Sequence, residues 1–188
     1  MYRIRFHGRG GQGIKTASRI LGTAFFIEGY EVQDAPRYGA ERRGAPIFAF
    51  VRAAKRRLLE RGIIQHPDLI AVADDSLVSV PAAGVVAGAD QHSVLLINSH
   101  TDANTWRSRL NYPGGIVTLP AAEEVEDRAE LPYVSAACAG AAARLVSRIS
   151  GAALEQAIRE ELAQLGREVV QRNLEVAVHA YEFMGDYA

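Results

Sequence analysis

The opening of the chain constrains its fold most, because residues 2–27 predict a strand, a glycine-rich turn and a helix in direct succession. Residues 2–6 alternate between apolar and basic side chains, which is typical of a strand with one buried face. The turn "HGRGGQG" follows, and from Ile14 onward apolar residues recur at helical spacing as far as a predicted stop at Gly29. Such a unit presents free backbone N–H groups at a helix N-terminus, where they attract anions.

The glycines of this turn allow three interpretations. Gly8, Gly10 and Gly13 have the G-x-G-x-x-G spacing of dinucleotide-binding turns, and Asp34 follows at about the distance expected for a ribose ligand. Arg9 is bulky for such a turn, however, and Asp34 begins an irregular loop. The stretch therefore indicates an anion or cofactor site, an NAD(P) site, or only a tight turn in which glycine permits positive φ and close packing.

Further strands and helices are predicted along the rest of the chain. Apolar runs predict strands over residues 30–33, 47–53, 68–73, 93–98 and 115–121. The last third predicts helices, the first of them rich in small residues, over residues 133–149, 153–165 and 167–184. Continuous apolar strands separated by helices or loops are typical of parallel sheets. We expect one Rossmann-like α/β domain over residues 1–188, with a mostly parallel sheet covered by helices on both faces and a helical C-terminal third.

Composition excludes several classes of function. The 188 residues carry a formal net charge of −1 and no long basic run, which disfavours nucleic acid as a partner. The single cysteine, Cys138, cannot form a disulfide framework, a zinc site or an iron–sulfur cluster by itself. Charges interrupt the N-terminal stretch, and no apolar run reaches the roughly 18 residues of a membrane span. We expect a cytoplasmic protein.

A second stretch, "RYGAERRGAP" at residues 37–46, concentrates charge in a loop. Arg37, Arg42 and Arg43 surround Glu41, and paired arginines can hold phosphates or carboxylates in a fork geometry. Glu41 is better suited to hold one guanidinium in place than to take part in chemistry. The alternative is a solvated loop with local ion pairs.

Together these stretches resemble a known family. "GRGGQGIKTASRILGTAF", "EGYEVQDAPRYGAERRGAPIFAFVR", "PDLIAVADDSL" and "LLINS" are similar to the gamma subunit of pyruvate:ferredoxin oxidoreductases and related 2-oxoacid:acceptor oxidoreductases. The similarity covers most of the first hundred residues and, more weakly, the C-terminal helices. The ordered combination of GGQG, YGAERRG and a strand ending in aspartate is specific, whereas the glycine spacing alone is not.

The resemblance implies a subunit rather than a complete enzyme. Family enzymes oxidatively decarboxylate a 2-oxoacid, usually to an acyl-coenzyme A, and pass electrons to ferredoxin or a similar acceptor. Thiamine diphosphate, magnesium and iron–sulfur clusters belong to alpha, beta and delta type subunits, while the gamma subunit is implicated in coenzyme A binding and site closure. Carried over by position, the binding candidates are Gly10, Gly11, Gln12, Gly13, Tyr38, Gly39, Glu41, Arg42 and Gly44. We expect no catalytic residue and no metal ligand in this chain.

Two rival functions stay open at this point. A free-standing NAD(P)-binding oxidoreductase would use the three spaced glycines together with Asp34. A purely structural assembly subunit would use the arginine loop only to hold partner subunits together.

Other polar residues are weaker candidates. Cys138 lies among alanines on a predicted helix and is expected to be a small buried hydrophobe. The five histidines show no metal spacing, although His7 lies beside the glycines and could face a bound anion. Asp74 and Asp75 are expected to cap a helix. Asn98 and Ser99 end a predicted strand at the edge where open α/β sheets bind ligands.

Overall fold

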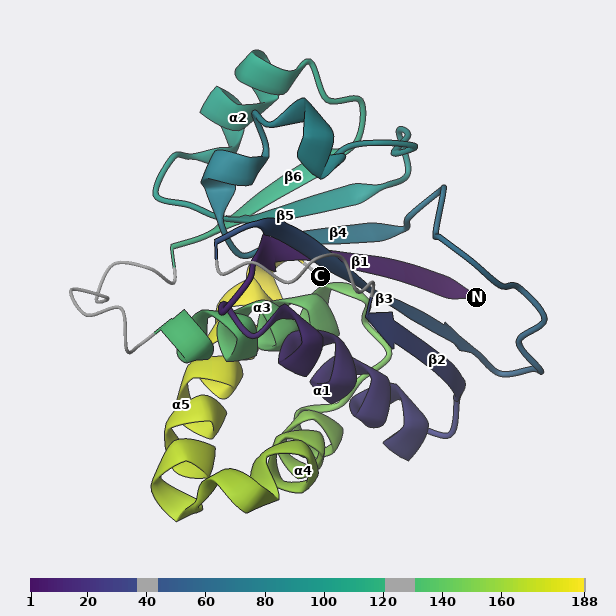
Figure 1. The fold of residues 1–188 in the computed structure, drawn as a ribbon, viewed down its shortest axis with the longest axis vertical. Coiled ribbons are helices and arrows are strands. Elements are labelled where there is room, and N and C mark those ends of the chain that lie inside the picture. The colour runs from purple at the N-terminus through teal and green to yellow at the C-terminus, as the bar shows by residue number, and fades with distance from the viewer. Residues whose placement is uncertain (37–43, 121–130, 188) are drawn as a thin grey trace.

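The computed structural model describes residues 1–36, 44–120 and 131–187 and contains six strands with helices on both sides (Figure 1). The strands are β1 Tyr2–Arg9, β2 Glu31–Pro36, β3 Pro46–Ala54, β4 Leu69–Val72, β5 Val94–Asn98 and β6 Gly115–Leu119. The α-helices are α1 Ile14–Ile27, α2 Ala103–Leu110, α3 Leu131–Leu145, α4 Gly151–Leu162 and α5 Arg167–Phe183. Short 3₁₀ turns include η1 Asp75–Leu77, η2 Pro81–Ala83, η4 Ala163–Leu165 and η5 Met184–Tyr187.

The six strands form one mixed sheet in the order β2-β3-β1-β4-β5-β6. β1, β4, β5 and β6 are parallel neighbours, so their carboxyl ends meet at one edge. β3 runs antiparallel to both β1 and β2 and separates them. The expected mostly parallel α/β sheet is confirmed, and the reversed strand between β1 and β2 is a feature that the sequence analysis did not predict.

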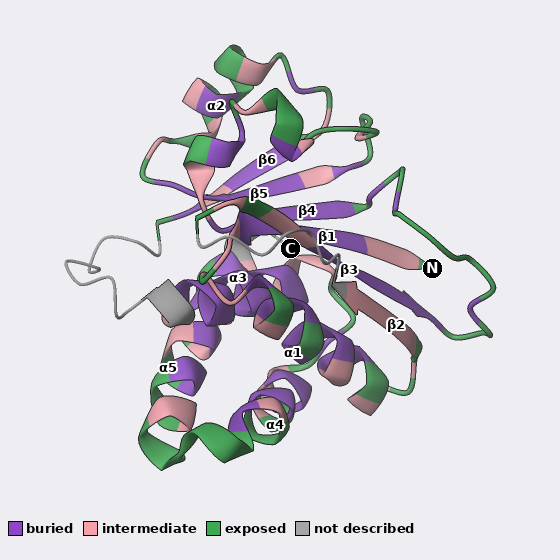
Figure 2. Cartoon of the chain, viewed as in Figure 1, coloured by how far each residue is buried: buried purple, intermediate pink, exposed green. Residues whose placement is uncertain are grey.

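One face of the sheet is covered by α1 and α3, and α4 and α5 pack on the outer side of these two helices. Ile4 and Phe6 of β1 point to this side and pack with apolar residues of α1, α3, α4 and α5 in the larger core. Figure 2 shows α1 and α3 next to the strands and α4 and α5 farther out. The small residues of α3 allow a close approach, because a Cβ on Gly140 would lie 2.0 Å from the carbonyl oxygen of Ala177 in α5. The prediction that this helix lies close to a neighbour is confirmed.

The opposite face is covered in two parts. α2, η1 and η2 pack over β4, β5 and β6 around a second core that includes Trp106 and Leu77. Over the rest of this face lies the segment 55–66, whose Leu58 and Ile64 are buried. Arg5 is 5% exposed, although an alternating strand predicts it on an open face, because this segment and its neighbours cover it. Its guanidinium donates to the carbonyl oxygen of Val85 at 2.7 Å.

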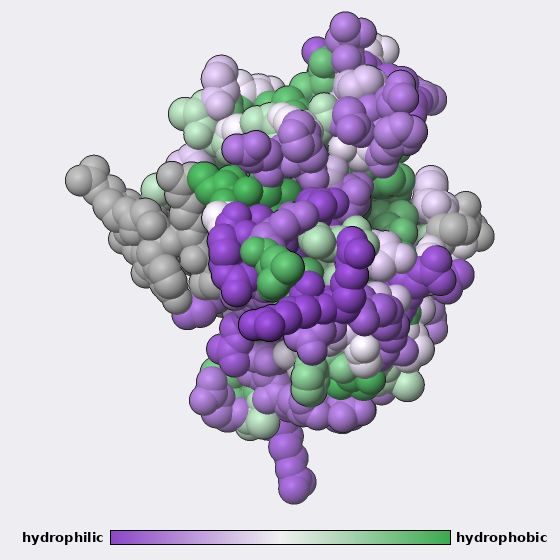
Figure 3. Space-filling view, turned by 90° about the vertical axis from the view of Figure 1, so that its right-hand side faces the viewer, coloured by the Kyte–Doolittle hydropathy of each residue, from purple (hydrophilic) through white to green (hydrophobic). Residues whose placement is uncertain are grey.

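The segment 55–66 gives the molecule a basic side. Its exposed residues include four basic side chains, two large apolar ones and one carboxylate, which pairs with Arg3: Lys55, Arg56, Arg57, Arg61, Leu59, Ile63 and Glu60. Figure 3 shows strongly hydrophilic residues across the middle of this side, with a hydrophobic spot among them and further hydrophobic areas around them. None of the helices in the described residues combines the length and apolar character needed to cross a membrane.

Candidate functional site

The glycine turn lies at the carboxyl end of β1 and leads directly into α1. Gly11 and Gly13 have φ values of 100° and 69°, a left-handed region that favours glycine. A Cβ on Gly8 would lie 2.4 Å from Cδ1 of Ile14, so Gly8 is needed for the packing of strand against helix. The local backbone conformation or packing thus favours glycine at three positions of the turn, as the tight-turn interpretation predicts.

The side chain of Gln12 closes the turn from within. Its Oε1 accepts a hydrogen bond from the backbone N–H of Arg9 at 2.7 Å, and its Nε2 donates to Oδ2 of Asp74 at 3.2 Å. These bonds fix the turn's shape, while the first N–H groups of α1 lie at the positive end of the helix dipole. This helix end can therefore attract an anionic group.

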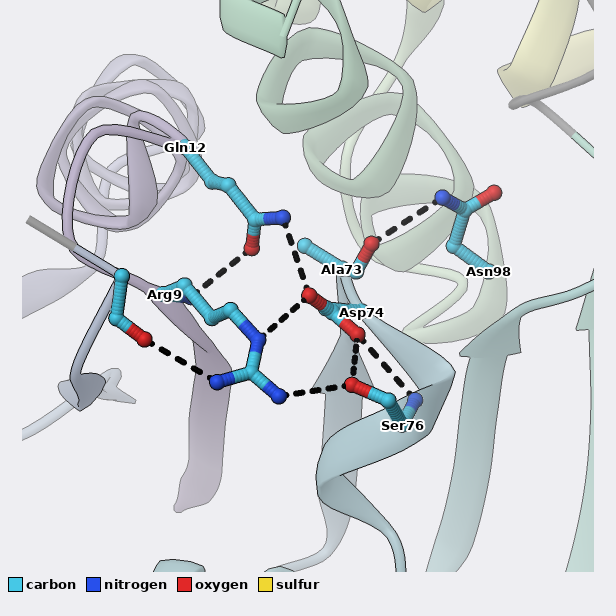
Figure 4. A network of polar contacts seen from close by, with 7 residues as sticks. Arg9, Gln12, Ala73, Asp74, Ser76 and Asn98 are labelled. Carbon is cyan, nitrogen blue, oxygen red and sulfur yellow. Dashed lines mark hydrogen bonds and ion pairs between the residues drawn. The ribbon is translucent and has the colours of Figure 1, made fainter.

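Arg9 connects three segments of the chain at this edge (Figure 4). Its guanidinium donates to Oδ2 of Asp74 at 2.8 Å, to the Gly44 carbonyl oxygen at 3.0 Å and to Oγ of Ser76 at 2.8 Å. One side chain thus connects the glycine turn, Gly44 near the end of the arginine loop, and η1. In the sequence, Arg9 only counts against a dinucleotide turn, and this bridging role is not predictable from its local pattern.

Asp74 is the acceptor on which this network depends. Partial burial opposes its ionisation, but hydrogen bonds from Ser76 and Arg9 outweigh burial, so the pKa of Asp74 is lowered. The carboxylate also receives the backbone N–H of Ser76 and so caps η1. The expected capping role is confirmed for Asp74, although it caps a single 3₁₀ turn and not an α-helix. Asp75 is the first residue of that turn.

The neighbouring strand end adds a second set of polar contacts. Asn98 donates from Nδ2 to the carbonyl oxygen of Ala73 at 3.0 Å, which ties the end of β5 to that of β4. Ser99 donates to Oδ2 of Asp75 at 2.6 Å and accepts from the indole N–H of Trp106 at 3.2 Å. Both lie at the predicted edge, where these contacts give them a structural role.

The end of the arginine loop lies beside the glycine turn. The N–H of Gly44 donates to the Gly10 carbonyl oxygen at 3.1 Å, and the N–H of Gly10 donates to that of Ala45 at 2.9 Å. These two bonds extend the pairing of β1 with β3 beyond the strands. Of the loop candidates only Gly44, with φ 84°, belongs to the described residues. Tyr38, Gly39, Glu41 and Arg42 lie outside them.

The NAD(P) alternative lacks support from this geometry. In a dinucleotide-binding fold the ribose-binding acid ends the strand next to the first one, but here β3 separates β2 from β1. Asp34 instead lies on the α1 side, in a shallow cleft of about 260 Å³ that it shares with Arg19 and Glu161. Burial raises the pKa of Asp34, so it is a poorer anionic acceptor than a solvated carboxylate.

His7 and Cys138 are both buried, and both are uncharged at neutral pH. Burial, and then the charge of Arg5, lower the pKa of His7 to about 3, so its ring is neutral and cannot attract an anion. The ring lies against Phe48, with centroids 5.7 Å apart. Burial raises the pKa of the Cys138 thiol to about 12, as expected for a small buried hydrophobe. Within the described ranges, no group of three or more His, Cys, Asp or Glu residues could hold a metal ion.

A family model and individual relatives place the chain in the same protein family. The model of the pyruvate ferredoxin/flavodoxin oxidoreductase family matches residues 3–183. The chain is 33% identical to the pyruvate/ketoisovalerate oxidoreductases common subunit gamma of Pyrococcus furiosus, over 97% of this chain and 96% of that one. It is 32% identical to the pyruvate synthase subunit PorC of Thermotoga maritima, over 96% of this chain and 93% of that one.

Solved structures agree with these sequence matches. The pyruvate oxidoreductase subunit PORC of Thermotoga maritima aligns with a TM-score of 0.78 and 31% identity, over 96% of this chain and 95% of that one. A 2-oxoglutarate:ferredoxin oxidoreductase of Magnetococcus marinus aligns with a TM-score of 0.74 over all of this chain but 31% of its own. Its 18% identity shows the shared fold alone.

Proposed function

Because this chain belongs to the pyruvate ferredoxin/flavodoxin oxidoreductase family, we propose that it serves as the gamma subunit of a multi-subunit 2-oxoacid:acceptor oxidoreductase. One observation carries this proposal: the chain aligns with gamma and PorC subunits over nearly its full length and nearly the full length of each of those subunits. The enzyme would decarboxylate a 2-oxoacid, transfer the acyl group to coenzyme A and pass electrons to ferredoxin or a similar acceptor. We assign residues 1–188 to a single gamma domain.

Within that enzyme, the glycine turn and the arginine loop would meet the incoming coenzyme and help to close the active site. The resemblance assigns this role to the GGQG turn, to Gly44 and to the loop residues Tyr38, Gly39, Glu41 and Arg42. Two features support it: the α1 N-terminus favours anionic groups such as a diphosphate, and Arg9 holds the loop's exit against the turn. The Magnetococcus marinus enzyme that shares this fold has coenzyme A bound.

The reactive groups would come from partner subunits. By the family resemblance, thiamine diphosphate, magnesium and iron–sulfur clusters would belong to alpha, beta and delta type chains. The one buried cysteine of this chain could not ligate a cluster by itself. This chain would contribute backbone dipoles, guanidinium charge and the exclusion of water from the thiamine-bound intermediate. Such an assembly, with its reduced clusters and a free thiol in this chain, fits a reducing cytoplasm.

Replacement of Arg42 tests the coenzyme role. In the assembled complex, Arg42→Ala should raise the apparent KM for coenzyme A by about tenfold, the effect of losing one charge-assisted contact. The kcat and the subunit composition should stay unchanged, and Arg56→Ala, a matched exposed arginine on the basic side, should change neither constant. Steady-state kinetics with varied coenzyme A and gel filtration give the two readouts.

Two other results would contradict this proposal in different ways. Loss of assembly in the Arg42→Ala variant would favour a purely structural loop. A native chain that purifies alone, without iron-bearing or thiamine-bearing partners, would refute the subunit assignment itself.

A further inference from the structure

A second cleft lies at the opposite end of the sheet from the glycine turn. It has a volume of about 470 Å³ and is formed where α1 ends, α3 ends and α4 begins, with Tyr181 of α5 as one wall. Its volume lies within the range of small-molecule sites, roughly 300–1,000 Å³. Because Glu28 and Tyr2 mark the far ends of α1 and β1, nothing bound here could contact the turn at residues 10–13.

Two arginines line this cleft, and among the described residues neither forms an ion pair. Arg148 donates from Nε to the hydroxyl of Tyr2 at 2.8 Å, which orients its guanidinium without cancelling its charge. The guanidinium of Arg144 lies 5.4 Å from the ring centroid of Tyr181, and its Nε is buried without a hydrogen-bond partner. This Nε is too deeply buried for a ligand in the cleft to reach, so Arg144 would pair with an anion through its terminal Nη groups.

Among the described residues, Glu28 is the one carboxylate that lines the cleft, and it is hydrogen-bonded to Ser150. Oε1 of Glu28 accepts the N–H of Ser150 at 2.9 Å and its hydroxyl at 2.7 Å, and these bonds lower the pKa of Glu28. Ser150 also caps α4, so the positive end of that helix dipole lies at the same place. Ser147, an exposed residue between the two arginines in the sequence, has a φ of 52°, and its hydroxyl donates to the carbonyl oxygen of Arg144 at 3.4 Å.

We propose that this cleft binds a small multivalent anion, a phosphate compound or a di- or tricarboxylate, between Arg144 and Arg148. Two guanidiniums can each form a forked pair with an anionic oxygen group, so the site suits a ligand with two such groups better than a monocarboxylate. Tyr181 supplies a flat apolar wall. The site is separate from the turn and loop assigned to coenzyme A, and the inference does not depend on that assignment.

Calorimetric titration of the full chain at low ionic strength tests the proposal. Pyrophosphate or citrate should bind saturably with one site per chain, and acetate should not. Comparison of pyrophosphate with citrate distinguishes the phosphate from the carboxylate class. Arg148→Gln should weaken binding by about tenfold, and Arg144→Lys, which keeps the charge but loses the fork, should weaken it by a smaller factor. Arg159→Gln, an exposed arginine paired with Glu155 on α4, is the matched control and should bind normally.

Three outcomes would overturn the proposal. The first is the lack of saturable binding for both probes. The second is an equal loss in the Arg159→Gln control, which would indicate nonspecific attraction. The third is binding by the isolated chain that disappears in the assembled complex, which would show that a neighbouring subunit occupies the cleft. Because Arg148 is exposed, its variant is expected to fold normally, and circular dichroism checks this.

Discussion

At the scale of single residues, burial determines the protonation state of the His7 imidazole, which the sequence alone does not indicate. The side chain is 3% exposed, Nε2 lacks a hydrogen-bond partner, and Arg5 lies on the same strand face. Protonation would bury an uncompensated cation beside another, so the pKa of His7 falls to about 3. A histidine next to a glycine turn therefore contributes a neutral ring to the sheet and no charge to the site.

The low pKa of His7 predicts a pH dependence of folding. Between about pH 6.5 and pH 3 the unfolded chain binds a proton that the folded chain does not, so stability falls as pH falls through this window. At pH 5 this single group should lower the free energy of unfolding by about 2 kcal/mol relative to pH 7. Urea denaturation at the two pH values measures the difference.

A matched pair of variants isolates this contribution. His7→Gln should remove that part of the pH dependence, whereas His179→Gln, at an exposed position on α5, should keep the wild-type profile. A His7→Gln profile that parallels the wild type would show that another group is responsible.

The residue scale also shows what the sequence could and could not predict at the candidate site. The strand, turn and helix were predictable from alternation, glycine and helical spacing, and so was the capping role of Asp74. The bond between Arg9 and Asp74 was not, because the two residues are 65 positions apart and meet only when β1 pairs with β4. A charged residue at the ends of two adjacent parallel strands was the signal available. The loop residues that the resemblance names lie outside the described structure.

At the scale of elements, the position of β3 accounts for the main difference between expectation and structure. Its apolar residues indicate a strand but carry no information on direction, which depends on how the chain passes through residues 37–45. β3 turns back against β1 and displaces β2 to the sheet edge. This reversal removes the geometry that an NAD(P) site requires, and it brings Gly44 to the glycine turn. The strands themselves were predictable, whereas their order was set by contacts distant in sequence.

Helix packing gives a prediction at the same scale. Gly140→Ala should destabilise the protein by about 1–3 kcal/mol or more, because the new methyl group would lie 2.0 Å from the Ala177 carbonyl oxygen and force α3 and α5 apart. This sign is opposite to the gain of roughly 1 kcal/mol that alanine brings to an open helix position. Gly151→Ala is the control, because its nearest contact would be 4.0 Å away, and it should be neutral or stabilising. Thermal unfolding of both variants measures the difference. Equal melting temperatures for Gly140→Ala and Gly151→Ala would contradict the close packing of α3 on α5.

At the scale of the whole molecule, the polar side chains of the sheet edge hold segments of the chain in place, and neither Cys138 nor His7 is suited to catalysis. The carboxyl edge of the sheet holds the turn, η1 and the exit of the arginine loop with a few charged and amide side chains. Its one cysteine has a pKa of about 12 and its buried histidine is neutral, so neither is a nucleophile or base at neutral pH. Sequence patterns alone left a free-standing oxidoreductase open. The arrangement of strands argues against it, and the full-length family match shows where the chain belongs.

If the reactive groups lie in partner subunits, as we propose, activity should require those subunits as well as this chain. The purified chain, supplied with pyruvate, coenzyme A and thiamine diphosphate, should reduce no methyl viologen, because the thiolates needed for a cluster are absent from its sequence. Addition of the thiamine-bearing and cluster-bearing subunits should bring 2-oxoacid-dependent reduction, and omission of this chain should abolish coenzyme-dependent turnover. The same preparation should show no saturable fluorescence transfer with NADH, since Asp34 is separated from the turn by β3. Turnover of a 2-oxoacid by the solitary chain, or tight NADH binding, would mean that the reactive centre lies within this polypeptide after all.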